Sequence, residues 1–130
     1  QKTFAEYITE GVQAYTDKNY DVASTYFLSA VKKNPDNYIA HYYLGLIAYA
    51  KNDYARAEEY YKTALALGSD QAITYYALGI NAFASKRFED AKTYLNKAAE
   101  IAPDKYADKV KELLARIEAG GWCCDSVLTN

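Results

Sequence analysis

Few residues in this chain could do chemistry by themselves. The 130 residues include one histidine, His41, and two adjacent cysteines, Cys123 and Cys124. A bridge between neighbouring cysteines is strained, and two thiols without a further pair or a nearby histidine make a poor metal site. The sequence contains no glycine-rich phosphate loop, metal-ligand motif or nucleophile elbow. We therefore predict no catalytic residue, no metal site and no cofactor, and we expect a protein that is not an enzyme.

The overall composition is that of an ordinary soluble globular protein. The formal net charge of -2 gives no reason to expect nucleic acid or an anionic membrane as partner. No apolar run reaches the roughly 20 residues that a membrane span needs, and no signal peptide is visible. The chain begins at Gln1 and has no methionine, which indicates a processed product or a piece of a longer protein. We expect a soluble protein, with the cytoplasm slightly favoured over the periplasm or the exterior, and the compartment stays open.

A repeat of 34 residues runs through the chain, set by Gly11, Gly45 and Gly79. Each glycine is followed at fixed distances by two alanines, an aromatic residue and a bulky apolar residue. In repeat order these positions hold Ala23, Ala57 and Ala91; Ala30, Ala64 and Ala98; Tyr20, Tyr54 and Phe88; and Phe27, Tyr61 and Leu95. His41 occupies the position that holds Tyr7 and Tyr75 in the other repeats. We therefore interpret His41 as a packing residue.

This pattern resembles the tetratricopeptide repeat (TPR) family, whose 34-residue unit carries an aromatic, Leu-Gly, small and aromatic positions, and a proline. The Leu-Gly pairs at 44–45 and 78–79 match directly, whereas Glu10 replaces the leucine in the first repeat and Ser69 replaces the proline in the second. The resemblance implies an all-α fold of three tandem helix-turn-helix repeats, 4–37, 38–71 and 72–105, in a right-handed superhelical solenoid. The glycines and alanines would lie where helix backbones cross closely.

The repeat predicts the helices and their ends. The first helices are expected at about 5–17, 38–51 and 72–85, and the second helices at about 21–33, 55–67 and 89–101. Asn19 and Asp53 stand where an N-cap is wanted. Gly68 should end the second helix of the middle repeat. Three aspartates keep the 34-residue period just before or within the first turn of the next helix, namely Asp36, Asp70 and Asp104.

The residues after the repeats divide into a cap and a tail. In a helix, residues 106–119 would place apolar side chains on one side and charged side chains on the other, which predicts a capping helix with a charged outer face. Gly120 and Gly121 should end that helix, leaving 120–130 as a flexible tail. Trp122 and the two cysteines lie in it. Three interpretations stay open: a disordered tail or a remnant foreign to the protein, a segment that docks on its own or a neighbouring chain, and redox or metal chemistry.

The first helix of each repeat carries a second apolar side. In the middle repeat Ile39, Tyr42, Leu46 and Tyr49 follow the spacing i, i+3, i+7, i+10 and share one side. Related positions return every 34 residues. In the TPR family this side lines the concave groove that binds peptides, so the resemblance implies a partner site. The predicted binding residues are Ile8, Val12, Tyr15, Ile39, Tyr42, Leu46, Tyr49, Ile73, Tyr76, Ile80 and Phe83.

These residues indicate what kind of partner to expect. Family members that hold an acidic C-terminal peptide place lysine and asparagine along this groove, and none stands at the predicted binding positions here, so a carboxylate clamp is not expected. An apolar, tyrosine-edged surface suits an amphipathic helix or an extended apolar segment. We predict a non-enzymatic protein–protein interaction module, an adaptor or scaffold, without nucleic-acid binding or membrane insertion. The alternatives are self-assembly, in which a neighbouring chain's terminal helix or tail fills the groove, tyrosines that serve only as packing, and an enzyme that needs a cofactor or domain outside this sequence.

Overall fold

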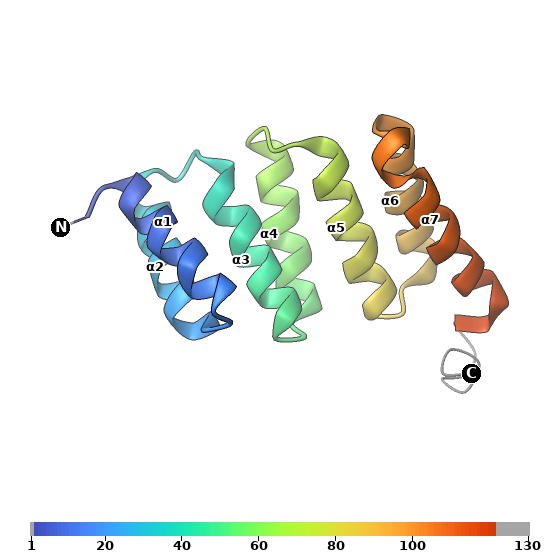
Figure 1. Ribbon diagram of the computed structural model, residues 1–130, viewed down its shortest axis with the longest axis horizontal. Coiled ribbons are helices and arrows are strands. Elements are labelled where there is room, and N and C mark those ends of the chain that lie inside the picture. The colour runs from blue at the N-terminus through green and yellow to red at the C-terminus, as the bar shows by residue number, and fades with distance from the viewer. Residues whose placement is uncertain (1, 122–130) are drawn as a thin grey trace. The chain divides into compact units, whose positions relative to one another are not determined.

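The computed structural model describes residues 2–121, and within that range it is made of helices and turns without a strand (Figure 1). The helices are α1 (Phe4–Thr16), α2 (Tyr20–Lys33), α3 (Tyr38–Ala50), α4 (Tyr54–Ala66), α5 (Gln71–Ala84), α6 (Phe88–Ile101) and α7 (Pro103–Arg116), followed by a π-helical turn, η1 (Ile117–Gly121). The prediction of an all-α chain is confirmed. Trp122 and the two cysteines lie outside the described residues.

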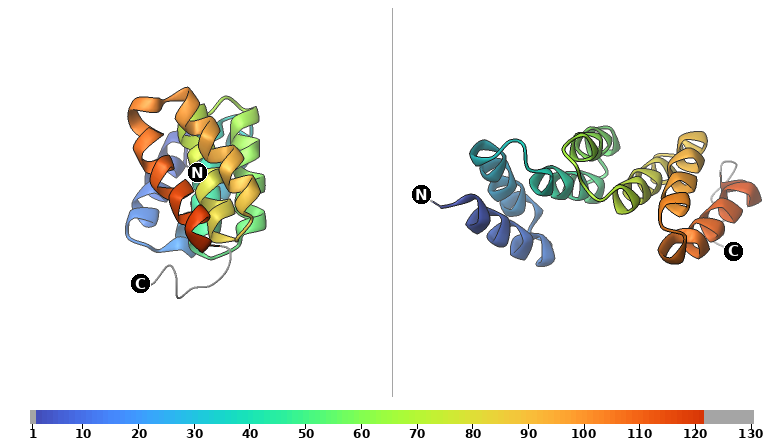
Figure 2. Two further views of the ribbon diagram at one scale, coloured as in Figure 1. Left: turned by 90° about the vertical axis from the view of Figure 1, so that its right-hand side faces the viewer. Right: turned by 90° about the horizontal axis from the view of Figure 1, so that it is seen from above.

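The chain divides into two compact units. Unit 1 (Gln1–Asp70) contains two antiparallel helix pairs, α1 with α2 and α3 with α4 (Figures 1 and 2). Unit 2 (Gln71–Asn130) contains the pair α5 and α6, with α7 packed on α6. No helix in the described range is both long and apolar enough to cross a membrane.

The repeat glycines lie where two helices of a pair meet. A Cβ atom built on Gly45 would lie 2.6 Å from Cε1 of Tyr61, closer than real Cβ atoms come to any neighbour. A Cβ atom built on Gly11 would lie 2.8 Å from the ring of Phe27, and one built on Gly79 would lie 2.5 Å from the side chain of Leu95. The three bulky residues are fully buried, as are the repeat alanines that follow them. Each repeat glycine is therefore in close contact with the bulky residue sixteen positions later, and this contact packs the two helices of the pair together.

The turns inside the three pairs share a backbone feature that sequence analysis did not predict. Lys18, Asn52 and Lys86, which are 34 residues apart, have φ values of 63°, 67° and 67°. The N–H of each following residue donates to a carbonyl in the last turn of the preceding helix, as from Asp53 to Ala48 at 2.8 Å. This is the pattern of a helix ended by a left-handed residue. In two of the three turns that residue is a lysine.

The predicted helix ends are confirmed in part. Asp53 caps α4, since its side chain accepts a hydrogen bond from the N–H of Arg56. Asn19 also lies at the N-cap of its helix, α2, as predicted, but its side chain makes no capping hydrogen bond. The two residues have nearly the same backbone angles, so the side chains make the difference. An asparagine at the N-cap can make such a bond, as Asn37 does for α3 by accepting from the N–H of Ile39 at 2.9 Å.

The ends of the other segments follow from proline and glycine. Gly68 has φ 96° just after α4, as its predicted role requires. The capping helix begins at Pro103 rather than residue 106 and ends at Arg116 rather than residue 119. Proline suits the first position of a helix because its fixed φ is helical and its missing N–H would have had no partner there. Asp104 lies in the first turn, as predicted.

Candidate functional site

We call the predicted binding residues the stripe, and the structure leaves them all in partial contact with solvent. Ile73 is exposed, and the other ten are half-buried. On α3 the buried residues include Leu44, Gly45 and Ala48, which lie on another side of the helix from the stripe. The separation of a core side from a second apolar side, which the sequence predicted for this helix, is therefore present.

In unit 1 the stripe comes from α1 and α3, which contact each other. Ile8, Val12 and Tyr15 of α1 pack against the edge of the unit's buried core. On α3, the ring of Tyr42 lies 5.8 Å from that of Tyr61. No residue of α3 is charged. This part of the stripe is therefore an apolar surface whose only polar side-chain groups are the phenol hydroxyls.

Three stripe rings also hold the turns inside the helix pairs. The ring of Tyr15 lies 5.8 Å from that of Tyr20, and that of Tyr49 lies 5.9 Å from that of Tyr54. In unit 2 the equivalent pair, Phe83 and Phe88, is 5.7 Å apart. Each pair joins the end of one helix to the start of the next. These rings contribute to packing as well as to the stripe, and their neighbours hold them in place.

In unit 2 the stripe residues of α5 lie beside α7. The rings of Tyr76 and Tyr106 are stacked, with centroids 4.8 Å apart. Lys109 Nζ is 5.9 Å from both ring centroids, and Arg116 Cζ is 5.6 Å from the centroid of Phe83. The charged side of α7 was predicted to face outward, and the contact of its cations with these rings was not predicted. The available signal was the seven-residue spacing of Lys109 and Arg116, which puts both on nearly the same side of a helix.

The ionisable side chains of the stripe are tyrosine phenols. Burial, with a smaller effect of the neighbouring Tyr20 and Tyr43, raises the pKa of Tyr15. Burial and the negative charge of Glu112 raise the pKa of Tyr76. These phenols stay protonated at pH 7 and can donate hydrogen bonds. They offer neither a nucleophile nor a general base.

His41 lies apart from the stripe. Its Nε2 donates to the carbonyl oxygen of Pro35 at 3.1 Å, and its ring is half-buried. Across residues 2–121 no three histidine, cysteine or acidic side chains come together as ligands for a metal ion.

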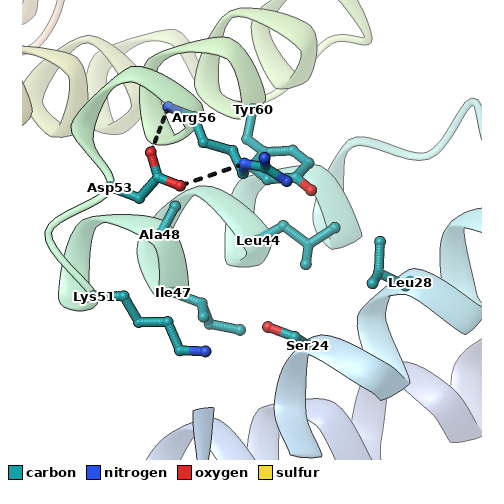
Figure 3. A pocket seen from close by; sticks show the side chains of 9 residues that line it. All are labelled: Ser24, Leu28, Leu44, Ile47, Ala48, Lys51, Asp53, Arg56 and Tyr60. Atoms are coloured by element: carbon teal, nitrogen blue, oxygen red, sulfur yellow. Dashed lines mark hydrogen bonds and ion pairs between the residues drawn. The ribbon is translucent and has the colours of Figure 1, made fainter. Parts of the chain in front are cut away.

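A hollow of about 360 Å³ lies between α2, α3 and α4, and sequence analysis missed it (Figure 3). It is on the opposite side of α3 from the stripe. Its two cations are already paired, Lys51 with Asp21 and Arg56 Nε with Asp53 Oδ2 at 3.4 Å. It therefore offers a partner no free charged group. The lining residues are Ser24, Leu28, Leu44, Ile47, Ala48, Lys51, Asp53, Arg56 and Tyr60.

Comparison with known proteins identifies the repeat. Two family models described as tetratricopeptide repeat match, one over residues 9–72 and the other over 48–117. No curated protein matches the sequence.

Solved TPR domains share the fold at low sequence identity. The first TPR of Spaghetti (RPAP3) bound to the HSP90 peptide SRMEEVD has a TM-score of 0.80 and 18% identity, over 89% of this chain and 94% of that one. The Arabidopsis OM64 TPR domain has a TM-score of 0.80 and 18% identity, over 88% and 95%. The N-terminal domain of stress-induced protein-1 from C. elegans has a TM-score of 0.74 and 18% identity, over 85% of this chain and 93% of that one. Because one family model spans more than half of the sequence and the helix pairs agree with it, the chain belongs to the tetratricopeptide repeat family, whose domains are protein–protein interaction modules.

Proposed function

We propose that the stripe binds another polypeptide, either an amphipathic helix or an extended apolar segment, and that the protein is a non-enzymatic adaptor or scaffold. The observation that carries this proposal is the half-burial of the stripe. Its side chains are too exposed to be core residues, yet all are apolar or aromatic. Apolar surface of this kind is a feature of interaction sites.

The energetics favour a ligand that covers this surface. Covering apolar area contributes about 25 cal/mol per Å², and each well-placed aromatic contact adds about 0.5–1.5 kcal/mol. The rings of Tyr15, Tyr49 and Phe83 already have neighbours that fix their positions. Binding therefore loses less side-chain entropy at these rings than it would at free side chains.

The similar domain of Spaghetti holds the peptide SRMEEVD, which supports a peptide as the class of ligand. The details of recognition should differ here. Val12, Leu46 and Ile80 occupy stripe positions where a polar residue is usual in the family. We therefore propose contact with apolar side chains as the main source of affinity, in place of a clamp on a terminal carboxylate.

Leu46→Lys tests the proposal. Leu46 is half-buried at the middle of the α3 stripe, so a lysine there puts a charge on the binding surface while its long stem reaches solvent. We expect the helical circular dichroism to stay unchanged and capture of partners from an extract of the source cells to fall at least about tenfold. Tyr49→Ala is a less clean test because it also removes the ring contact with Tyr54.

Leu28→Lys is the matched control. Leu28 is 51% exposed, lines the hollow on the other side of α3, and should tolerate lysine without loss of partners. If the Leu46 variant keeps the partners of the unmodified chain, the stripe is not the site. Sedimentation of both variants separates self-assembly from foreign binding. If the unmodified chain forms an oligomer and the Leu46→Lys variant is a monomer, a second copy of the chain covers the stripe.

A further inference from the structure

In unit 2 the stripe has charged neighbours. In unit 1 it carries no charged side chain, and α3 has none at all. In unit 2 Lys109 and Arg116 of α7 lie over the stripe rings of Tyr76 and Phe83, within 6 Å of the ring centroids. A cation at this distance from a ring makes a weak favourable contact and keeps its hydrogen-bond donors free.

Neither cation is matched by a carboxylate. Within residues 2–121, Lys109 and Arg116 make no ion pair, and both are exposed. The hollow beside α3 differs, because Lys51 and Arg56 are paired there with Asp21 and Asp53. The stripe of unit 2 therefore has donors that a ligand could use.

The spacing of the two cations limits what can pair with both. Seven residues along α7 correspond to about 10 Å. Two acidic side chains match this distance when they are two turns apart on a helix, or about three residues apart in an extended segment. Glu112 lies between the cations in sequence, and its charge reaches Tyr76, so these three side chains together carry a net single positive charge. A ligand with two acidic groups is favoured over one with two basic groups.

We propose that unit 2 selects acidic side chains in the partner. The ligand is an amphipathic peptide segment whose apolar side chains cover Tyr76, Ile80 and Phe83 and whose aspartate or glutamate side chains pair with Lys109 and Arg116. This inference rests on the proposed function and adds the charge of the partner to it. The ring contacts hold the cations beside apolar surface, where a covering ligand reduces the screening of the ion pair by water.

A displayed peptide library tests the proposal with the full chain. The probe is a phage library of random peptides of about 16 residues, or four helical turns. Each peptide is fused at its C-terminus, so no terminal carboxylate is available. We expect peptides selected on the unmodified chain to be enriched in large apolar residues and in aspartate and glutamate. Selection on the double variant Lys109→Gln with Arg116→Gln should keep the apolar enrichment and lose the acidic enrichment.

Lys111→Gln is the matched control, because it removes one positive charge from an exposed position on another side of α7. It should select the same acidic peptides as the unmodified chain. A selected peptide, made with blocked ends, should bind the double variant at least about tenfold more weakly in fluorescence polarisation. Exchange of both cations for glutamate should restore binding to a version of the peptide whose acidic residues are lysines.

Each outcome decides between the two proposals. The proposed charge selection would be overturned if peptides selected on the unmodified chain contained no excess of acidic residues. It would also be overturned if the acidic enrichment persisted in selection on the double variant, or if Lys111→Gln removed it equally. The proposed function would still stand if apolar enrichment were present on the unmodified chain and on the double variant. A library that yields no enrichment on the unmodified chain would overturn both. Circular dichroism and urea unfolding of each variant establish that the helices are retained.

Discussion

Gly45→Ala should destabilise the protein although alanine is the better helix former. Gly45 lies inside α3, where alanine in place of glycine would by itself contribute up to about 1 kcal/mol. The new Cβ would lie 2.6 Å from Cε1 and 2.7 Å from Cδ1 of Tyr61, whereas ordinary contacts lie at 3.4–4 Å. The ring cannot move away freely, because Tyr61 is only 1% exposed. The steric overlap therefore outweighs the gain in helix propensity, and the substitution should lower the free energy of unfolding.

The size of the effect follows from these two terms. Inserting a methyl group into a tightly packed core typically costs about 1–3 kcal/mol, and the overlap here is severe enough for the upper part of that range. After the gain in helix propensity we expect a net loss of about 1–2 kcal/mol in the free energy of unfolding. Unfolding in urea, followed by circular dichroism, measures this loss.

A double-mutant cycle identifies the cause. Tyr61→Val removes Cδ1 and Cε1, the two atoms nearest to the added methyl group. In that background Gly45→Ala should be neutral or stabilising, because only the propensity term is left. If Gly45→Ala raises the stability of the unmodified chain, or lowers it equally in both backgrounds, the glycine is not required by the ring and this account of the repeat is wrong.

Two further predictions concern the turns and the buried phenols. Lys18→Asn should raise the free energy of unfolding by about 0.5–1 kcal/mol, because lysine at φ 63° is strained while asparagine tolerates this conformation; an unchanged urea midpoint would contradict this. Burial, with a smaller effect of Tyr42, raises the pKa of Tyr61 above its usual value, so Tyr61 loses its proton in the unfolded chain before it does so in the folded one. Below pH 10 this group adds no pH dependence, and above it stability should fall by up to about 1.4 kcal/mol per pH unit. Tyr61→Phe should reduce that slope in alkaline urea titrations, and an equal slope would assign the loss to other groups.

The helix pairs could be predicted because their determinants are local and repeated. Glycine, the two alanines and the bulky residue that meets the glycine return at constant distances, and the structure brings each glycine against its bulky partner. The side of α3 that faces away from the core could be predicted for the same reason, since residues three, four and seven apart share a helix face. The stripe residues are accordingly half-buried, and whether they bind a partner stays a prediction.

Other features depend on information that the repeat does not contain. The left-handed turn residues were not predicted, because two of them are lysines and only Asn52 is a residue that favours this conformation. The position of α7 was missed at both ends, and its start was missed because the predicted third repeat runs to residue 105, past the proline at which the helix begins. The contact of Lys109 and Arg116 with the stripe rings depends on how α7 packs within unit 2. Their seven-residue spacing puts both on one side of the helix, but it does not say which rings that side meets.

The ring contacts divide the stripe into two kinds of residue, and this decides which substitutions are informative. Tyr15, Tyr49 and Phe83 each pack on a ring at the start of the following helix, so their removal changes stability and binding together. Leu46 lies on the same face, and an aliphatic side chain there contributes area without such a ring pair. A ligand contact should therefore appear as lost affinity without lost stability only at positions of the second kind. Loss of binding at the ring positions alone, with Leu46→Lys silent, would mean that the rings hold the fold and that the ligand lies elsewhere.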